Sequence, residues 1–428
     1  MLDNLDCNLS QYEVSHGNAF LPDQLPLQRL SDPYYVEWES VIEALPELLR
    51  SGELIPAINE LPVLQASRLT SEEEWRRAYM ILAFFTHAYI WGGEKPSEIL
   101  PPCVTVPFLE VSDHLGLPPT ATYAALNLWN YKTVDPTIPL SVPENLQVLH
   151  SFTGTDDEAW FYLISVAIES RGAHTIPLMV QCMEAARRGD HWKVVQGLDA
   201  LRVCINELGV ILERMYERLD PQVFYFHIRP FLAGSKGMAT AGLPRGVFYD
   251  EGDGKGEWRQ YSGGSNAQSS LIQFFDIILG VQHYSGGELI KNSFIEVRQG
   301  DAEYSNPNVQ ANGWAGNARF LQYLGRAANI REYALNPSTE NTVLEAYNAA
   351  VAALAAFRDK HIQIVTRYII MPSRMKAQQT NTVNIASASS IKDGEDKADK
   401  KLYGTGGTAL IPFLKQTRDE TKKAASAE

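Results

Sequence analysis

Apolar residues recur at intervals of three and four along most of the second half of the chain. From about His191 to Leu219 this spacing predicts one long amphipathic helix. Its apolar positions are Leu198, Leu201, Ile205, Leu208, Leu212 and Met215. Thr155 and Glu158 form a cap signal before WFYLISVAIES, and residues 340 to 371 predict another long helix that Pro372 closes. No segment after residue 147 alternates convincingly in the manner of a strand, so this region is expected to be all helical.

The first 131 residues instead mix helices with proline-rich connections. The clearest helix follows LTSEEEW, where Ser71 and Glu74 form a capping box and Gly92 and Gly93 follow the last turn. The segment KTVDPTIPLSVPENL, residues 132–146, carries three prolines and is interpreted as a linker. The sequence thus predicts a mainly α protein, with a small mixed N-terminal domain (1–131), a linker (132–146) and a large all-helical domain (147–428).

Near the C-terminus a polar tract interrupts the helical pattern. Residues 373–402 are rich in Ser, Asn, Lys and Asp and predict a mobile loop, because they cannot bury enough apolar surface. The following GTGGTALIPFLKQTRDE predicts a glycine-threonine turn that leads into a short amphipathic helix.

Charge and cysteine content narrow the possible partners. The formal net charge is -14, which argues against nucleic acid or an anionic membrane as a general partner and favours small molecules. The four cysteines lie far apart without CxxC spacing and are interpreted as reduced thiols. No apolar run reaches the roughly 18 residues that a membrane span needs, and the N-terminus lacks a signal pattern, so a cytoplasmic location is expected.

Motifs for the common hydrolytic and phosphate-binding chemistries are absent. The sequence contains no HExxH, GxSxG or GxxxxGK[ST] pattern. The segment GGSNAQSS, taken alone, predicts a tight turn in which Ser265 or Asn266 caps the next helix.

One histidine, His361, lies within the long helical pattern of residues 340–371. A histidine in such a place is most often a satisfied core or surface residue. Arg358, three residues earlier, lies on the same helical face, and the pair could instead hold a haem iron and a haem propionate. The spacing alone leaves both interpretations open.

Several separated blocks resemble the indoleamine 2,3-dioxygenase family. They include LPPCVTVPF, LGLPPTATYAALNLWNYK, RPFLAGSKG, YSGGSNAQSSLIQFFDIILGVQH, HIQIVTRYIIMP and GTGGTALIPFLK, in the family's order. The length and the polar insert before GTGGT look most like fungal members. The resemblance implies a monomeric enzyme that uses ferrous haem b, an unidentified reductant and dioxygen. It would open the indole ring of L-tryptophan, or of a related indole, to give N-formylkynurenine as the first step of the kynurenine pathway.

The resemblance also assigns roles to individual residues. His361 matches the proximal iron ligand. The positions that match cofactor-binding residues are Arg358, Asp276 and Gly264. The positions that match the substrate pocket are Tyr123, Phe161, Ser165, Phe224, Arg229, Ser265 and Thr405. No side chain is expected to act as a catalytic acid or base, because Ser165 and Ser265 are poor bases at neutral pH.

Three positions depart from the family pattern, namely Ser235, Asn127 and Asn266. Because of them, one alternative is that the protein is a weak paralogue that acts on another indole. A non-catalytic, myoglobin-like oxygen binder is a second alternative, and a haem-free structural protein is a third. The enzyme is favoured because an oxygen store has no use for Arg229 as a carboxylate clamp or for a lid at residues 404–408.

Overall fold

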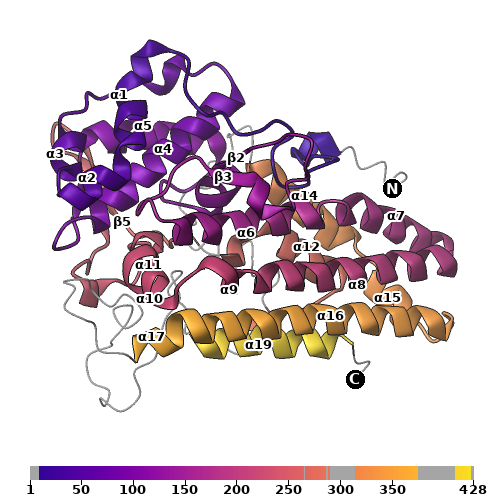
Figure 1. Ribbon diagram of the computed structural model, residues 1–428. Coiled ribbons are helices and arrows are strands. Elements are labelled where there is room, and N and C mark those ends of the chain that lie inside the picture. The colour runs from indigo at the N-terminus through magenta and orange to yellow at the C-terminus, as the bar shows by residue number, and fades with distance from the viewer. Residues whose placement is uncertain (1–8, 265, 286–287, 290–313, 375–409, 426–428) are drawn as a thin grey trace.

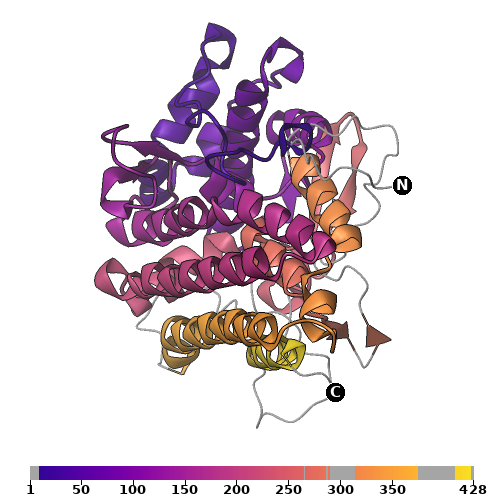
Figure 2. The ribbon, with the colours of Figure 1, turned by 90° about the vertical axis from the view of Figure 1, so that its right-hand side faces the viewer.

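Long helices stacked in rows dominate the computed structural model, and a group of shorter helices from the first third of the chain lies above them (Figure 1). The structure describes residues 9–264, 266–285, 288–289, 314–374 and 410–425. Seen from the side, the last helix, α19, lies against α16 at one edge of the stack (Figure 2), and the two are in contact.

The first third of the chain is built from short helices around one long buried helix. Its helical segments are η1 (Leu9–Tyr12), η2 (Pro33–Tyr35), α1 (Val36–Glu43), α2 (Leu45–Ser51), α3 (Leu54–Asn59), η3 (Ala66–Arg68), α4 (Glu72–Trp91), α5 (Pro102–Leu115) and η4 (Ala124–Leu128). Every residue of α4 from Arg77 to Ile90 is buried, so this helix is enclosed on all sides rather than on one face.

The remaining helices form the stack. They are η5 (Pro143–Asn145), α6 (Asp156–Gly172), α7 (Thr175–Arg188), α8 (His191–Glu213), α9 (Met215–Arg218), α10 (Pro221–Val223), η6 (Phe224–Ile228), α11 (Arg229–Leu232), η7 (Ala239–Ala241), η8 (Asn266–Gln268), α12 (Ser270–Ile278), α14 (Trp314–Ala327), α15 (Ile330–Leu335), α16 (Asn341–Val365), η9 (Thr366–Ile370), α17 (Met371–Ser373) and α19 (Leu410–Ala424). Helix α16 packs on α8 and on α19, and α8 also packs on α6 and α7.

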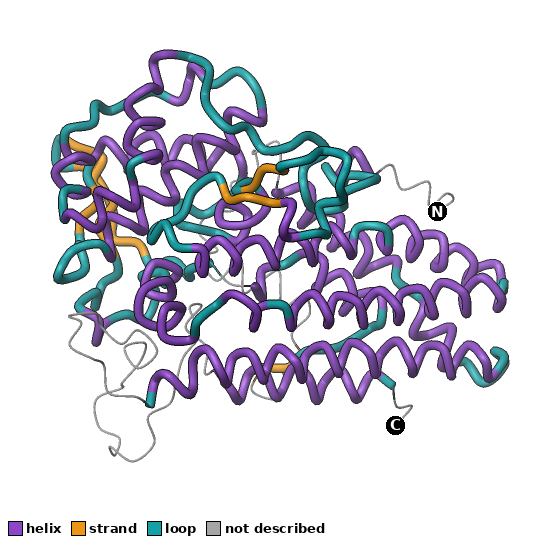
Figure 3. The backbone as a smooth tube through the Cα atoms, viewed as in Figure 1, coloured by secondary structure: helices purple, strands orange, loops and turns teal. Residues whose placement is uncertain are grey.

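The strands are few and short (Figure 3). Strands β1 (Ile99–Leu100), β4 (Val247–Gly252) and β5 (Lys255–Arg259) form one sheet, in which β4 pairs with β1 in parallel and with β5 antiparallel. Two antiparallel pairs are β2 (Tyr131–Thr133) with β3 (Leu146–Val148), and β6 (Tyr284–Ser285) with β7 (Glu288–Leu289).

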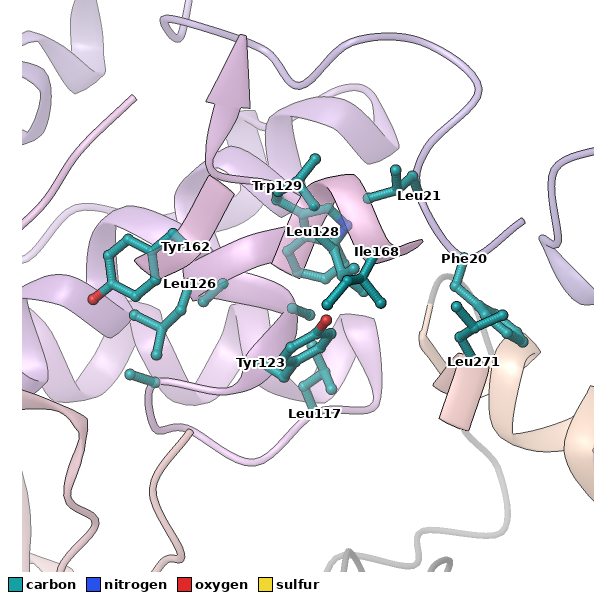
Figure 4. Packing of buried hydrophobic residues seen from close by; sticks show 14 of the residues in the cluster. Phe20, Leu21, Leu117, Tyr123, Leu126, Leu128, Trp129, Tyr162, Ile168 and Leu271 are labelled. Atoms are coloured by element: carbon teal, nitrogen blue, oxygen red, sulfur yellow. The ribbon is translucent and has the colours of Figure 1, made fainter. Parts of the chain in front are cut away.

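A single large hydrophobic cluster joins the early helices to the stack. Figure 4 shows part of it, with side chains from residues 117–129 and from α6. The part of the chain that the structure describes contains no helix with the length and apolar character of a membrane span.

The mainly α class and the long helices are confirmed. The Ser71 hydroxyl accepts a hydrogen bond from the Glu74 amide at 3.3 Å, and the Thr155 hydroxyl accepts one from the Glu158 amide at 3.3 Å. The capping box is incomplete, because the Glu74 carboxylate accepts from the Thr70 amide, one residue before the cap, at 2.7 Å.

Two predictions need correction. Residues after 147 are not all helical, because β4 and β5 form a hairpin whose turn has positive φ at Asp253 and Gly254. The linker at 132–146 stays a prediction, and its ends pair as β2 and β3. Ser269, and not Asn266, caps α12 by accepting from the Ile272 amide at 3.4 Å. The division into two domains stays a prediction, and most of the predicted mobile loop (373–402) lies outside the described residues.

A buried histidine connects α4 to later parts of the chain. The Nε2 atom of His87 accepts from the Ala121 amide at 3.0 Å, so Nδ1 carries the proton and donates to the Phe231 carbonyl at 2.7 Å. Burial lowers the pKa of His87 to about 4. The unfolded chain therefore binds a proton more readily than the folded protein, and stability is lost as the pH falls from about 6.5 toward 4.

We expect this group to lower the free energy of unfolding by about 2 kcal/mol between pH 7 and pH 5. His87→Gln should be less stable than the wild type at pH 7 and should lack that part of the acid-induced loss. Denaturant titrations of both proteins at the two pH values measure the difference. Equal pH dependence in both proteins would contradict the assignment.

Candidate functional site

A pocket opens where six helical segments meet. Its lining comes from α6, α8, η8, α16 and α19, from the residue before η4, and from the start of α12 with its cap residue. The lining residues are Tyr123, Ser165, Ile168, Leu212, Asn266, Ser269, Ile272, Gln273, Phe357, Arg358, His361, Phe413, Leu414 and Thr417. The empty space in the pocket, including its mouth, is about 830 Å³. The mostly apolar lining with a few polar groups is typical of small-molecule and cofactor sites.

The imidazole of His361 faces this pocket from α16. Burial, with a smaller contribution from the positive charge of Arg358, lowers its pKa to about 4, so the ring is neutral at pH 7. The described residues give this imidazole neither a hydrogen bond nor an ion pair. A neutral imidazole with an unused nitrogen lone pair is able to bind a metal.

Arg358 lies one turn before His361 and is held by two other helices. Its Nη2 atom donates to both carboxylate oxygens of Asp276 on α12, each at 2.7 Å, and its Nη1 atom donates to the Thr421 hydroxyl on α19. Burial alone would raise the pKa of Asp276, but the charge of Arg358 and the contacts of His283 and Arg358 outweigh it and lower the pKa. Asp276 therefore stays ionised behind Arg358, which lies at the wall of the pocket.

A second polar group lies beside the pocket on α6. The carboxylate of Glu169, which is fully buried, accepts hydrogen bonds from the Tyr123 hydroxyl at 3.0 Å and from the Ser269 hydroxyl at 2.6 Å. Burial and the charge of Glu169 raise the pKa of Tyr123 well above its ordinary value. Ser269 also caps α12, so Glu169 links α6 to the helix that carries Asp276.

Removal of the Tyr123 hydroxyl should destabilise the protein. Tyr123→Phe takes one hydrogen bond from a buried carboxylate, for which we expect a loss of about 1.5–3 kcal/mol in the free energy of unfolding. Denaturant titration measures this loss. Tyr162→Phe is the matched comparison and should lose stability in the same range, because Tyr162 also donates to a buried glutamate, Glu158, at 2.9 Å, but does not line the pocket. An unfolding midpoint for Tyr123→Phe equal to that of the wild type would contradict the role of this bond.

The predicted aromatic residues form a separate group next to the pocket. The rings of Phe161 and Phe224 are 5.0 Å apart, and Phe224 meets Tyr368 edge-on at 5.9 Å. Phe161 lies one helical turn before Ser165 on α6, and Tyr368 lies on η9, which continues α16 beyond His361. Helix α6 and the continuous α16–η9 segment therefore connect this group to the pocket. Phe161, Phe224 and Arg229 are not among the residues that line the pocket itself.

Arg229 is buried at the start of α11, with only 2% of its surface exposed. Its guanidinium carbon lies 5.7 Å from the centre of the Tyr225 ring. Burial lowers its pKa to about 10, which still leaves the guanidinium charged at neutral pH. A buried cation of this kind is suited to an anionic partner.

Glycines allow close backbone contact near the site. A side chain at Gly264 would approach Leu126 Cδ1 to 2.6 Å, so this residue packs tightly against the segment that carries Tyr123. Gly234 and Gly263 pack backbone to backbone, since a Cβ at Gly234 would lie 2.3 Å from the Gly263 nitrogen. Ser265 and Thr405 lie outside the described residues.

The three departures from the family pattern have different surroundings. Asn266 lines the pocket. Ser235 is buried and its hydroxyl accepts from the Tyr261 amide at 3.1 Å, which gives it a structural role. Asn127 is buried in η4 and donates to the Tyr123 carbonyl at 3.2 Å.

The sequence analysis missed several polar residues of the site. Only Glu169 among them has a recognisable signal in the sequence. Its carboxylate interrupts the apolar run WFYLISVAIES one turn after Ser165, a pattern that could have been recognised. The sequence gives no such signal for three further residues, because their partners are distant in the sequence. These are Thr421 on α19 and, beyond Asp276, His283 and Glu420.

The chemistry of this lining fits haem. A haem iron needs one axial side chain, and His361 offers a neutral imidazole at the pocket. Arg358, on the same wall, offers a cation for a carboxylate of the cofactor. Among the described residues, no group of three or more His, Cys, Asp or Glu side chains is arranged to hold a bare metal ion.

Comparison with known proteins gives a consistent result over nearly the whole chain. A family model described as indoleamine 2,3-dioxygenase matches residues 8–424. An indoleamine 2,3-dioxygenase of Saccharomyces cerevisiae is 41% identical over 433 residues, which cover 97% of this chain and 93% of that protein. An indoleamine 2,3-dioxygenase of Aspergillus nanangensis is 40% identical over 432 residues, which cover 99% and 98%. A Fusarium equiseti protein named 6-hydroxytryptophan 2,3-dioxygenase is 35% identical over 427 residues and matches along 100% of both chains.

Proposed function

The chain belongs to the indoleamine 2,3-dioxygenase family and is a dioxygenase, and on this premise we propose that it uses haem b to open the indole ring of L-tryptophan. Both atoms of dioxygen would be added across the C2–C3 bond to give N-formylkynurenine. The observation that carries the proposal is the neutral, otherwise unbonded imidazole of His361, which faces a pocket beside Arg358.

Two residues of α16 would hold the cofactor. His361 would donate its lone pair to the iron, and Arg358 would pair with a carboxylate of the cofactor while it keeps its contact with Asp276. When bound, ferrous haem supplies the dioxygen chemistry, which no side chain of the protein can provide.

The aromatic group and Arg229 would bind the amino acid. Phe161 and Phe224 offer ring surfaces for the indole, and the buried guanidinium of Arg229 offers a charge-assisted pair for the substrate carboxylate. Ser265 and Thr405 would contribute to the same pocket, as the family resemblance implies. The protein's contribution is then orientation of the indole and exclusion of water.

Among the described residues of the pocket, and apart from His361, which is assigned to the iron, no side chain is suited to abstract a proton from the indole. The Ser165 hydroxyl is a poor base at neutral pH. The carboxylate of Glu169 is fully buried and is engaged by the hydroxyls of Tyr123 and Ser269. This favours direct addition of oxygen to the electron-rich ring.

The test is an assay of reduced, haem-loaded protein with L-tryptophan in air. Formation of N-formylkynurenine is followed by absorbance, and mass spectrometry with isotopically heavy dioxygen should place both heavy atoms in the product. Turnover at micromolar to millimolar tryptophan would support the proposal. A stable oxygenated spectrum without product would favour an oxygen binder. Turnover of 6-hydroxytryptophan alone would favour a substituted indole, the substrate named for the Fusarium equiseti relative.

The remaining proposals rest on the family resemblance and on the charge of the chain. We propose a monomer in the cytoplasm that depends on a separate reductant to keep the iron ferrous. The net charge of -14 supports a small-molecule substrate rather than nucleic acid.

A further inference from the structure

Behind the pocket, the Arg358–Asp276 pair continues into a buried chain of polar, ionisable side chains. The Nε2 atom of His283 lies 3.4 Å from Asp276 Oδ2, and its Nδ1 atom lies 2.7 Å from Glu420 Oε2. The second oxygen of Glu420 accepts from the Gln416 side-chain amide at 2.7 Å. His283, Asp276 and Glu420 are all more than nine-tenths buried, so water does little to screen these interactions.

This chain joins parts of the protein that are far apart in the sequence. Asp276 lies near the end of α12, His283 in the loop after it, Glu420 on α19 and Arg358 on α16. His283 and Glu420 are 137 residues apart. Neither lines the pocket, and neither does Asp276, whereas Arg358 does.

The chemistry of the chain leaves Arg358 able to bind a further anion. A guanidinium has five N–H donors, and the bonds to Asp276 and Thr421 use only its two terminal nitrogens.

We propose that His283 and Glu420 are positioning residues for the cofactor. Together they hold Asp276, Asp276 holds the guanidinium of Arg358 at the pocket wall, and Arg358 binds a carboxylate of the haem. The two residues thus increase cofactor retention without contact with the cofactor. This inference rests on the haem site proposed above.

The experiment measures the rate at which haem leaves the protein for an excess of a haem-accepting apoprotein. Wild type, His283→Gln, Glu420→Gln and the double variant are compared. Each single variant should release haem about tenfold faster than the wild type, because a charged hydrogen bond in the chain is lost. The double variant should release it no faster than the faster single variant, because the two side chains act as one unit.

A haem derivative with esterified propionates distinguishes positioning from simple structural support. This derivative cannot pair with Arg358, so its release should be equal in all four proteins. His114→Gln is the control, because its Nε2 atom contacts Glu72 at 2.8 Å and neither residue lines the pocket. This control should release haem at the wild-type rate.

Three results would overturn the inference. One is unchanged haem release in His283→Gln and Glu420→Gln proteins that fold with wild-type unfolding midpoints. Another is equal acceleration for haem and for its ester, which would mean that the pair only anchors α19. A wild-type protein that binds no haem would refute the proposed function, and the inference with it. Haem binding by the wild type, together with wild-type rates of haem release in both single variants, would refute the inference and leave the proposed function intact.

Discussion

The His361→Ala protein should purify without a stable haem Soret band. The substitution removes the only side chain that we assign to the iron, so haem affinity should fall by more than the roughly 10–100-fold that loss of an outer-shell partner causes. The fold should survive, because the imidazole makes no hydrogen bond with the described residues and lines a pocket rather than a packed core.

Absorbance spectra after haem reconstitution measure this effect. Added imidazole should restore part of the Soret band, since the alanine leaves room for a free ligand at the same place. His174→Ala provides a control, because His174 lies at the surface and bonds only near its own turn, to Arg171. A His361→Ala protein with an unchanged Soret band would refute the proximal assignment.

Arg229→Ala should raise the Michaelis constant for L-tryptophan about a hundredfold with little change in haem content. Truncation of one partner of a buried, hydrogen-bonded charge pair costs about 2–5 kcal/mol, and each 1.4 kcal/mol or so corresponds to a factor of about ten in affinity. Arg229 is 2% exposed, so a substrate carboxylate bound to it would be shielded from water.

Tryptamine, which lacks the carboxylate, separates this role from a general disturbance of the pocket. The penalty should appear for tryptophan and be largely absent for tryptamine. Unfolding midpoints show whether the variant keeps its fold. Identical kinetics for tryptophan in both proteins would remove Arg229 from the substrate site.

Short-range information in the sequence accounts for most of the helices. The cap residues Ser71 and Thr155 mark true helix starts, and the three-and-four spacing after His191 predicts α8 and α9 with only a break at Arg214. These signals work because caps and helical faces involve residues within one or two turns of each other.

The sequence was less informative where long-range contacts decide the structure. Strand β4 pairs with β1, which lies about one third of the chain away. The β4–β5 hairpin is rich in glycine and has a weak strand pattern, and this long-range pairing adds hydrogen bonds to it. The π-helical turns η4, η6 and η9 were also not predicted. Helix η4 follows Tyr123, η6 is followed by Arg229, and η9 contains Tyr368, whose ring contacts Phe224. Such turns depend on local packing rather than on residue type.

By itself, the sequence determined the helical class, the acidic character and, through its separated motif blocks, the family and the residues expected to bind haem and tryptophan. Only the tertiary structure showed that α19 closes one wall of the pocket and that Arg358, Asp276, His283 and Glu420 form one buried chain. Periodicity reports which side of an element is buried but not which distant element covers it. Charge pairing across 137 residues is decided when the helices pack, because burial makes an unpaired charge too costly to leave.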